Sequence, residues 1–273
     1  MPDLPIIPLA VSPARNILAV ETSTEYLSLA LLLGGQCYAT HTRAGQGHSG
    51  EVLPAIHRLL ETQQTTLAEC AVLAFGCGPG AFTGLRIAAG VIQGLAFALD
   101  KPVIPIVSLQ ALARQIGEAL HGGTQSVPIG TTVLSLLDAR MGEVYCAAYQ
   151  LRQDGWWETL TEPALLKPAD VLSHLQIALP QTVSFSAIGG NGLAAYPDLA
   201  TSLAELGPCV LPEVVPMARD VAYLASLAFA QGLVVSAAEA QPLYIRNKVA
   251  QTVAERMAIA SAPVLMSPTS QGA

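Results

Sequence analysis

Charged side chains are scarce in this sequence, which gives only 12% of its 273 residues to Asp, Glu, Lys and Arg and 52% to hydrophobic types. A globular protein usually has about twice that share of charge. The 13 basic residues form no run and are outnumbered by 20 acidic ones, for a net charge of −7. Because nucleic acid binding depends on clustered Lys and Arg, the chain alone should bind nucleic acid poorly. A partner protein that covers part of the surface would explain the low charge.

Patterns that would place a metal ion or an activated nucleophile are also missing. The five cysteines show no Cys-x-x-Cys spacing, which predicts reduced thiols. No two of the five histidines stand three or four residues apart, so no helix can present a pair of imidazoles to a metal. Neither Gly-x-Ser-x-Gly nor Ser-x-x-Lys occurs. We therefore expect no metal site and no catalytic residue.

Long apolar segments are absent too. The longest apolar helical patterns, at 87–99 and 221–235, fall short of the roughly 18 residues that a bilayer span needs. Near the start of the chain, prolines at positions 2, 5, 8 and 13 interrupt any helix, which argues against a signal peptide. We expect residues 1–15 to form a flexible tail and the protein to be soluble, cytoplasmic and not bound to a membrane.

What the sequence does contain is an alternation of apolar runs and helical patterns. Strands are expected at 17–20, 26–33, 36–42, 70–75, 103–107, 132–137, 143–151, 157–161 and 183–188, and helices at 49–60, 82–99, 108–120, 168–177 and 218–231. Ser108 is the expected N-cap of the 108–120 helix. The second half opens on a hairpin like that of the first, which is weak evidence for a duplication. We predict two α/β domains, at 16–120 and 121–255, and a disordered tail at 256–273.

A glycine-rich loop, GCGPGAFTGLR at 76–86, joins a predicted strand to the 82–99 helix. A Walker loop requires Lys and then Ser or Thr after its last glycine, but Leu85 and Arg86 follow Gly84. The dinucleotide pattern Gly-x-Gly-x-x-Gly fails as well, because no glycine occupies its sixth position. Two interpretations stay open: a tight turn needed for packing, or a loop whose free amides attract an anion.

Two acidic residues, Glu21 and Asp138, end strands that would face a cleft between the domains. Carboxylates at such positions could coordinate magnesium, so a sugar-type or acetate-type kinase is an alternative function. Acids at strand ends are more often simply solvated.

Five segments, in this order, resemble the TsaB (YeaZ) family: ILAVETSTEYLSLALL, HSGEVLPAIHRLL, AFGCGPGAFTGLRIAAGVIQGLA, DARMGEVY and PLYIRN. Together they run from residue 17 to residue 247, and GPGAFTGLR and DARMGEVY are the most specific of them. The resemblance implies two duplicated actin-like or Hsp70-like α/β domains, of the ASKHA and RNase H-like kind, that flank a cleft. It also implies a part in forming N6-threonylcarbamoyladenosine at position 37 of tRNAs that read ANN codons.

Members of that family are the non-catalytic partners of a homologous subunit, TsaD, which transfers the threonylcarbamoyl group, and the ATPase TsaE is the third member. The resemblance therefore implies that this chain is not an enzyme. By the same resemblance, tRNA would be bound only through the complex, and ATP, ADP and metal would be bound by the partner subunits.

TsaD-like catalysts hold a metal through a His-x-x-x-His pair, which aligns here with Leu109 and Ala113. Neither side chain has a lone pair to donate, which argues against the other alternative, an M22-like metallopeptidase. The phosphate turn of the ATPase relatives reads Glu21-Thr22-Ser23 and lacks its glycine, which implies weak or absent nucleotide binding. The residues of this degenerate nucleotide site would be Glu21, Thr22, Ser23, Gly78, Gly80, Thr83 and Asp138.

The 82–99 helix is apolar almost all round, so it must be buried in the fold or against another protein. In the family, this helix and the one at 49–60 pair with the partner subunit, and the same surface could form a homodimer when the partner is missing. The candidate interface residues are Val52, Ile56, Leu59, Phe82, Arg86, Ala89, Ile92, Gln93 and Phe97. An Ile92→Asp change is expected to prevent pairing while the chain stays folded.

Overall fold

The computed structural model describes residues 6–8, 16–44, 48–122, 126–180 and 183–246, and within them the chain forms two six-stranded sheets. In spatial order the first sheet contains β1 (Ile6–Pro8), β4 (Gln36–Arg43), β3 (Tyr26–Leu33), β2 (Ile17–Glu21), β5 (Val72–Gly78) and β6 (Val103–Val107). The second contains β10 (Ala164–Leu166), β8 (Glu143–Leu151), β7 (Thr132–Arg140), β11 (Ala187–Gly189) and β12 (Val210–Leu211), with β9 (Trp157–Thr159) paired to β8.

Seven α-helices accompany the sheets in the described part of the chain. They are α1 (His48–Thr62), α2 (Phe82–Leu99), α3 (Ser108–Leu120), α4 (Val171–Ala178), α5 (Asn191–Ala195), α6 (Pro197–Leu203) and α7 (Ala218–Ala230). Short 3-10 turns lie at Leu67–Glu69, Pro168–Asp170 and Ala237–Glu239.

Both sheets follow the same plan, which confirms the predicted duplication. In the first, β2, β3 and β4 form an antiparallel meander, and β5 and β6 continue the sheet parallel to β2. In the second, β7 and β8 are antiparallel, and β11 and β12 continue parallel to β7. Every residue of β2 and β5 is buried, as expected for parallel strands with helices on both faces.

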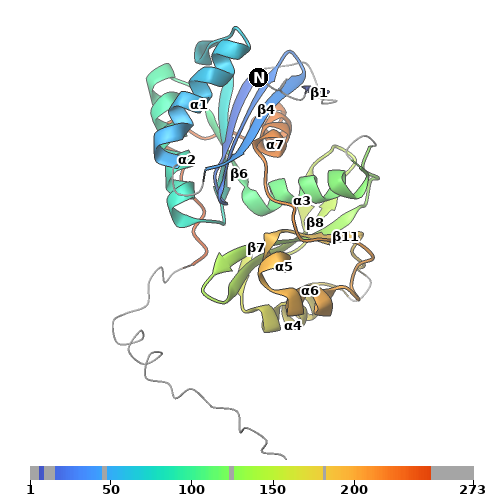
Figure 1. Cartoon of the computed structure of the whole chain (residues 1–273). Coiled ribbons are helices and arrows are strands. Elements are labelled where there is room, and N and C mark those ends of the chain that lie inside the picture. The colour runs from blue at the N-terminus through green and yellow to red at the C-terminus, as the bar shows by residue number, and fades with distance from the viewer. Residues whose placement is uncertain (1–5, 9–15, 45–47, 123–125, 181–182, 247–273) are drawn as a thin grey trace, which may run out of the picture.

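Helices cover both faces of the first sheet. Figure 1 shows α1 and α2 on one side of it and α7 on the other. In the second sheet, α4, α5 and α6 pack on the outer face, and α3 packs on the inner face against β7 and β11.

The two domains exchange helices, which corrects the predicted boundary between residues 120 and 121. The α3 helix, expected in the first domain, packs mainly on the second sheet, and α7, expected in the second domain, packs on β2, β3 and β5 of the first. Ser28 in β3 receives a hydrogen bond from the amide of Ala218, the first residue of α7, at 2.9 Å. One apolar core therefore runs from the inner face of one sheet, through α3 and α7, to the inner face of the other.

Three local predictions are also corrected. A strand, Ile6–Pro8, lies within the expected tail 1–15 and pairs with β4. The hydroxyl of Ser108 does not cap α3 but binds Glu21 at 2.9 Å. Among the helices of the described residues, α2 has the length and apolar composition to span a bilayer, although apolar patterns were expected to stay shorter. The predicted disordered tail 256–273 lies outside the described residues.

Candidate functional site

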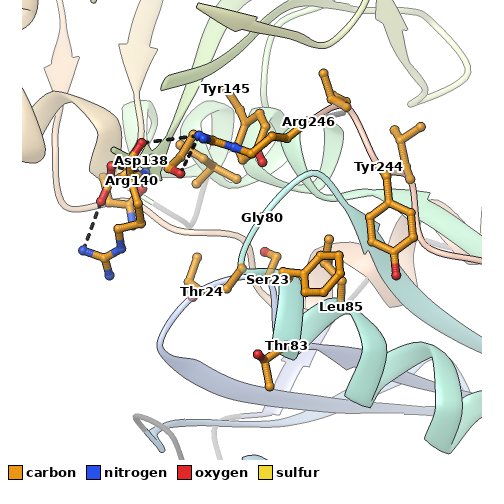
Figure 2. Close-up of a pocket in the computed structure, with 18 of the residues that line it drawn as sticks. Ser23, Thr24, Gly80, Thr83, Leu85, Asp138, Arg140, Tyr145, Tyr244 and Arg246 are labelled. Carbon is orange, nitrogen blue, oxygen red and sulfur yellow. Dashed lines mark hydrogen bonds and ion pairs between the residues drawn. The ribbon is translucent and has the colours of Figure 1, made fainter. Parts of the chain in front are cut away.

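A pocket of about 780 Å³ lies between the two halves of the molecule. On one side it is lined by the turn after β2 and by the loop that opens α2. On the other it is lined by the β7–β8 hairpin and the first residue of α5, and residues 243–246 complete the lining. Figure 2 shows Asp138, Arg140 and Arg246 across the pocket from Ser23, Thr24 and Thr83.

The glycines of the loop before α2 let two backbones approach closely. A Cβ atom on Gly84 would lie 1.9 Å from the carbonyl oxygen of Thr22, and one on Gly80 would lie 2.5 Å from the Cβ of Ser23. The hydroxyl of Thr22 donates to the carbonyl of Gly84 at 2.9 Å, and the amide of Ala81 donates to the carbonyl of Ser23 at 2.7 Å. These contacts lock the loop onto the turn after β2, as the packing interpretation predicts.

Glu21 is buried beneath this turn and does not line the pocket, which corrects its place among the nucleotide-site candidates. Its carboxylate accepts hydrogen bonds from the amide of Ser23 at 2.5 Å and from the hydroxyl of Ser108 at 2.9 Å. Burial raises the pKa of Glu21 above its ordinary value, and these hydrogen bonds oppose the rise. The side chain therefore braces the fold and is not presented to a magnesium ion in the cleft.

Asp138 does line the pocket, but its carboxylate is engaged. It accepts hydrogen bonds from the amide of Arg140 at 2.8 Å and from the hydroxyl of Tyr196 at 3.2 Å, and it pairs with the Arg140 guanidinium at 3.1 Å. Arg140, Met141 and Gly142 all have positive φ angles. Met141 and Gly142 form the two-residue loop of the hairpin, and positive φ at both loop residues is typical of such a tight turn. Asp138 holds Arg140, the residue before this loop. These contacts support a structural role for this acid.

Residues 243–246 tie the two halves together. The amide of Leu243 donates to the carbonyl of Cys77 at 2.7 Å, at the end of β5. The Tyr244 hydroxyl accepts a hydrogen bond from Arg86 of α2 at 3.1 Å. On the other side, Arg246 binds Glu143 at 2.7 Å and the carbonyl of Ala139 at 3.0 Å. Residues 243–246, within the segment PLYIRN, thus contact both the glycine loop and the DARMGEVY hairpin.

The structure brings together part of the predicted nucleotide site. Ser23, Gly80, Thr83 and Asp138 line the pocket, whereas Thr22 and Gly78, like Glu21, lie outside its lining. Sequence reasoning did not place four residues that the pocket does contain: Arg140, Asn191, Tyr244 and Arg246. The signals were present, because Asn191 follows a strand end and the other three belong to motifs that were recognised only by resemblance.

No group of three or more His, Cys, Asp and Glu side chains that could hold a metal occurs among the described residues. Leu109 and Ala113, which align with the histidine pair of TsaD-like proteins, are fully buried in the core around α3. At these positions the two side chains pack in the apolar core, and neither has an atom that could coordinate a cation.

Most of the predicted interface residues are buried, which corrects that assignment. The five that lie in the core beneath α1 and α2 are Val52, Ile56, Leu59, Ala89 and Ile92. They pack on the first sheet and are not available to a partner in this conformation. Gln93 binds the carbonyl of Ala240 at 2.8 Å, and the Arg86 guanidinium lies 3.8 Å from the ring centre of Phe82. Arg86 and Phe97 are the exposed members of the set, and Phe97, at 83% exposed, is the apolar one.

The exposed face of α2 is an unusual surface. Gly90 and Gly94 are exposed, and a Cβ on either would meet no atom within 4 Å. Ile87, Val91 and Leu95 are half-buried and border these glycines. This open face, which we call the α2 stripe (residues 87, 90, 91, 94, 95 and 97), is apolar.

Comparisons with known proteins agree with this architecture. Residues 41–266 match the model of a family described as TsaD, tRNA N6-adenosine threonylcarbamoyltransferase. The Escherichia coli protein TsaB, named for tRNA threonylcarbamoyladenosine biosynthesis, is 37% identical over 238 residues, which cover 86% of this chain and 96% of that protein. Its Haemophilus influenzae counterpart is 35% identical over 242 residues, 86% of this chain and 94% of the relative. The structure of YeaZ from Pseudomonas aeruginosa, at 34% identity, superposes with a TM-score of 0.70 and covers 85% of this chain and 100% of that one.

Two duplicated α/β halves around a central pocket define the actin-like class of folds. Within that class, the extent of the matches decides the family. This chain belongs to the TsaB family.

Proposed function

We propose that this protein is a non-catalytic subunit of the complex that forms N6-threonylcarbamoyladenosine at position 37 of tRNAs that read ANN codons. It pairs with a TsaD-type catalytic subunit in the cytoplasm, and a TsaE-type ATPase joins them. The names of its relatives and of the matching family support the pathway. The observation that carries the pairing is the α2 stripe, where glycines at 90 and 94 leave apolar surface open.

The stripe suits a helix of a partner protein. Glycines bordered by Ile87, Val91 and Leu95 allow two helix backbones to approach closely, and Phe97 supplies an aromatic anchor at one end. Without the partner, two copies of the chain could cover the same face in a homodimer.

The proposal also leaves tRNA, nucleotide and metal to the partner subunits. The net charge of −7 gives the chain no electrostatic attraction for RNA. Glu21 and Asp138 are occupied by contacts within the chain, which favours a supporting role over the kinase alternative.

Pairing is tested with the full chain and a purified TsaD-type homologue by isothermal titration calorimetry. Phe97→Asp places a charge on the stripe and should weaken binding about 30-fold or more, the size expected for an aromatic anchor. The matched control is Ile177→Asp, because Ile177 is an equally exposed apolar residue (88%) on α4 in the second domain. Equal affinities of the two variants would refute the assigned interface.

The non-catalytic role needs a separate assay. The chain, the TsaD-type subunit, and both together are incubated with threonylcarbamoyl adenylate and tRNA. We expect modified tRNA only when the TsaD-type subunit is present. Modified tRNA formed by the chain alone would show that it is an enzyme.

A further inference from the structure

Arg86 is an exposed cation beside the α2 stripe, and it has no ion pair among the described residues. Its own helix, FTGLRIAAGVIQGLAFAL, contains no Asp or Glu that could neutralise it. Arg140 and Arg246, by contrast, each bind a carboxylate within the chain. The charge of Arg86 is therefore available to a carboxylate from outside.

Two aromatic side chains hold the Arg86 guanidinium in one orientation. Its central carbon, Cζ, lies 3.8 Å from the ring centre of Phe82 and 5.9 Å from that of Tyr244. Its Nε donates to the Tyr244 hydroxyl at 3.1 Å, which leaves both terminal nitrogens without a partner among the described residues. A guanidinium binds a carboxylate through two parallel hydrogen bonds, and a group that is fixed beforehand loses less entropy on binding. Arg86 is thus preorganised to receive a carboxylate.

Arg86 lies on the same line of the α2 surface as Gly90 and Phe97. At about 3.6 residues per turn, the three residues fall within about 40° of one another around the helix axis. At about 1.5 Å per residue, Arg86 and Phe97 are about 16 Å apart along that axis. This line therefore has a cation at one end, an exposed aromatic side chain at the other and an open glycine between them.

The surroundings favour a protein carboxylate over a nucleic acid as the group that Arg86 meets. A nucleic acid binds to several clustered cations, whereas Arg86 is the only charged residue in the sequence of α2. The whole chain also carries a net charge of −7. The apolar stripe that follows Arg86 needs an apolar surface to cover it. A protein helix with one acidic side chain meets both requirements.

We propose that Arg86 pairs with an acidic side chain of the TsaD-type partner, on a helix that lies along the α2 stripe. This inference rests on the proposed pairing and adds the chemistry of the partner's surface. The partner helix presents a carboxylate about 16 Å, or about three turns, from the residue that packs on Phe97, with small or apolar residues between them. The ion pair sets the direction and register of the two helices, because apolar contacts alone permit several.

The experiment measures the affinity of the full chain for the purified TsaD-type homologue by isothermal titration calorimetry at low and at high NaCl. Arg86→Met keeps the length of the side chain and removes its charge. It should weaken binding about tenfold at low salt and lose most of the salt dependence that the native chain shows. Arg86→Lys keeps the charge but not the planar fork, so its affinity should lie between the two.

A matched control and a second variant test the role of orientation. Arg43→Met removes an exposed arginine at the end of β4, toward the other edge of the first sheet from β5 and β6, and should bind like the native chain. Tyr244→Phe keeps the ring and the charge but removes the hydroxyl that orients Arg86, and should weaken binding about threefold. If Arg86→Met does not fold, Arg86→Lys and Tyr244→Phe decide, and native affinity in both overturns the proposal.

A double-mutant cycle identifies the carboxylate. Each exposed Asp or Glu of the homologue is changed in turn to Asn or Gln, and each variant is titrated with the native chain and with Arg86→Met. At one position the Arg86→Met change should no longer weaken binding, because the ion pair is already absent. A cycle that finds no such position overturns the proposal.

The outcomes separate this inference from the proposed pairing. If the native chain binds the homologue and Phe97→Asp weakens binding, but Arg86→Met binds as tightly as the native chain, the ion pair alone is refuted. If the native chain does not bind the homologue, the pairing and the ion pair are refuted together.

Two further results would assign Arg86 to another partner and overturn the proposal. One is an Arg86→Met chain that self-associates more weakly in sedimentation velocity but binds the homologue with native affinity. The other is binding of tRNA to the chain alone that is lost in Arg86→Met.

Discussion

At the scale of single residues, the glycines of α2 serve opposite purposes in the first turn and in the middle of the helix. Gly84, in the first turn, is buried against the backbone of Thr22, where any side chain would collide. Gly90 and Gly94, in the middle, are exposed and touch nothing. One residue type therefore marks internal packing in one place and an open surface in another.

This difference predicts opposite effects of the same substitution on stability. Gly84→Ala should lower the free energy of unfolding by about 1–3 kcal/mol or more, because a Cβ 1.9 Å from the Thr22 carbonyl forces the loop and turn apart. Gly90→Ala should raise it by up to about 1 kcal/mol, because alanine favours an exposed helix. Urea denaturation measures both. A Gly84→Ala chain as stable as the native one would contradict the close packing.

At the scale of elements, α2 has one buried face and one exposed face, which its sequence does not distinguish. The helix is apolar almost all round, but only six of its residues are buried: Gly84, Leu85, Ala88, Ala89, Ile92 and Ala96. They pack on β5 and β2, while the opposite face stays open. The expectation that Ile92 contacts a partner failed because an apolar pattern on all sides does not indicate which side the sheet will cover.

Two aspartate substitutions separate these faces. Ile92→Asp should lower the free energy of unfolding by about 4 kcal/mol or more, because it buries a carboxylate at a fully buried position. Phe97→Asp should change it by no more than about 0.5 kcal/mol, because Phe97 is exposed. Thermal and urea unfolding of each variant, monitored by circular dichroism, decide the point. A folded and stable Ile92→Asp chain would restore the original assignment.

At the scale of the whole molecule, the crossing of α3 and α7 joins the two halves. Arg114 of α3 is hydrogen-bonded to Asp220 of α7, and both side chains are buried. Arg114 also pairs with Glu118 at 2.5 Å and lies 4.0 Å from the ring centre of Tyr223. A buried charge of this kind depends on its partner, because neither group can return to water while the helices stay packed.

Asp220→Ala should therefore lower the free energy of unfolding by about 3–5 kcal/mol, since it leaves the Arg114 guanidinium buried without its main counter-ion. The control is Asp154→Ala, which removes an exposed carboxylate 3.5 Å from Arg152 and should cost no more than about 1 kcal/mol. Guanidinium chloride denaturation of both variants measures the difference. Equal losses would mean that the helix crossing is held by apolar packing alone.

The sequence by itself determined most of the secondary structure. The bounds of β3, β8, α2 and α3 agree with the expected ranges, because apolar periodicity, glycines and prolines act through neighbours in the chain. The order of the elements also indicated the α/β class and the repeated hairpin, and the motifs indicated the family.

The tertiary structure alone decided which helix belongs to which sheet, which face of α2 stays open and which acids reach the pocket. Glu21 and Asp138 have similar places in sequence, yet one is enclosed by Ser108 and the other lines the pocket. Tyr244 and Arg246 join the pocket only because the chain returns to it after α7. These outcomes depend on contacts between segments that are far apart in the sequence, as Glu21 and Ser108 are, 87 residues from each other, and such contacts leave no local pattern in the sequence.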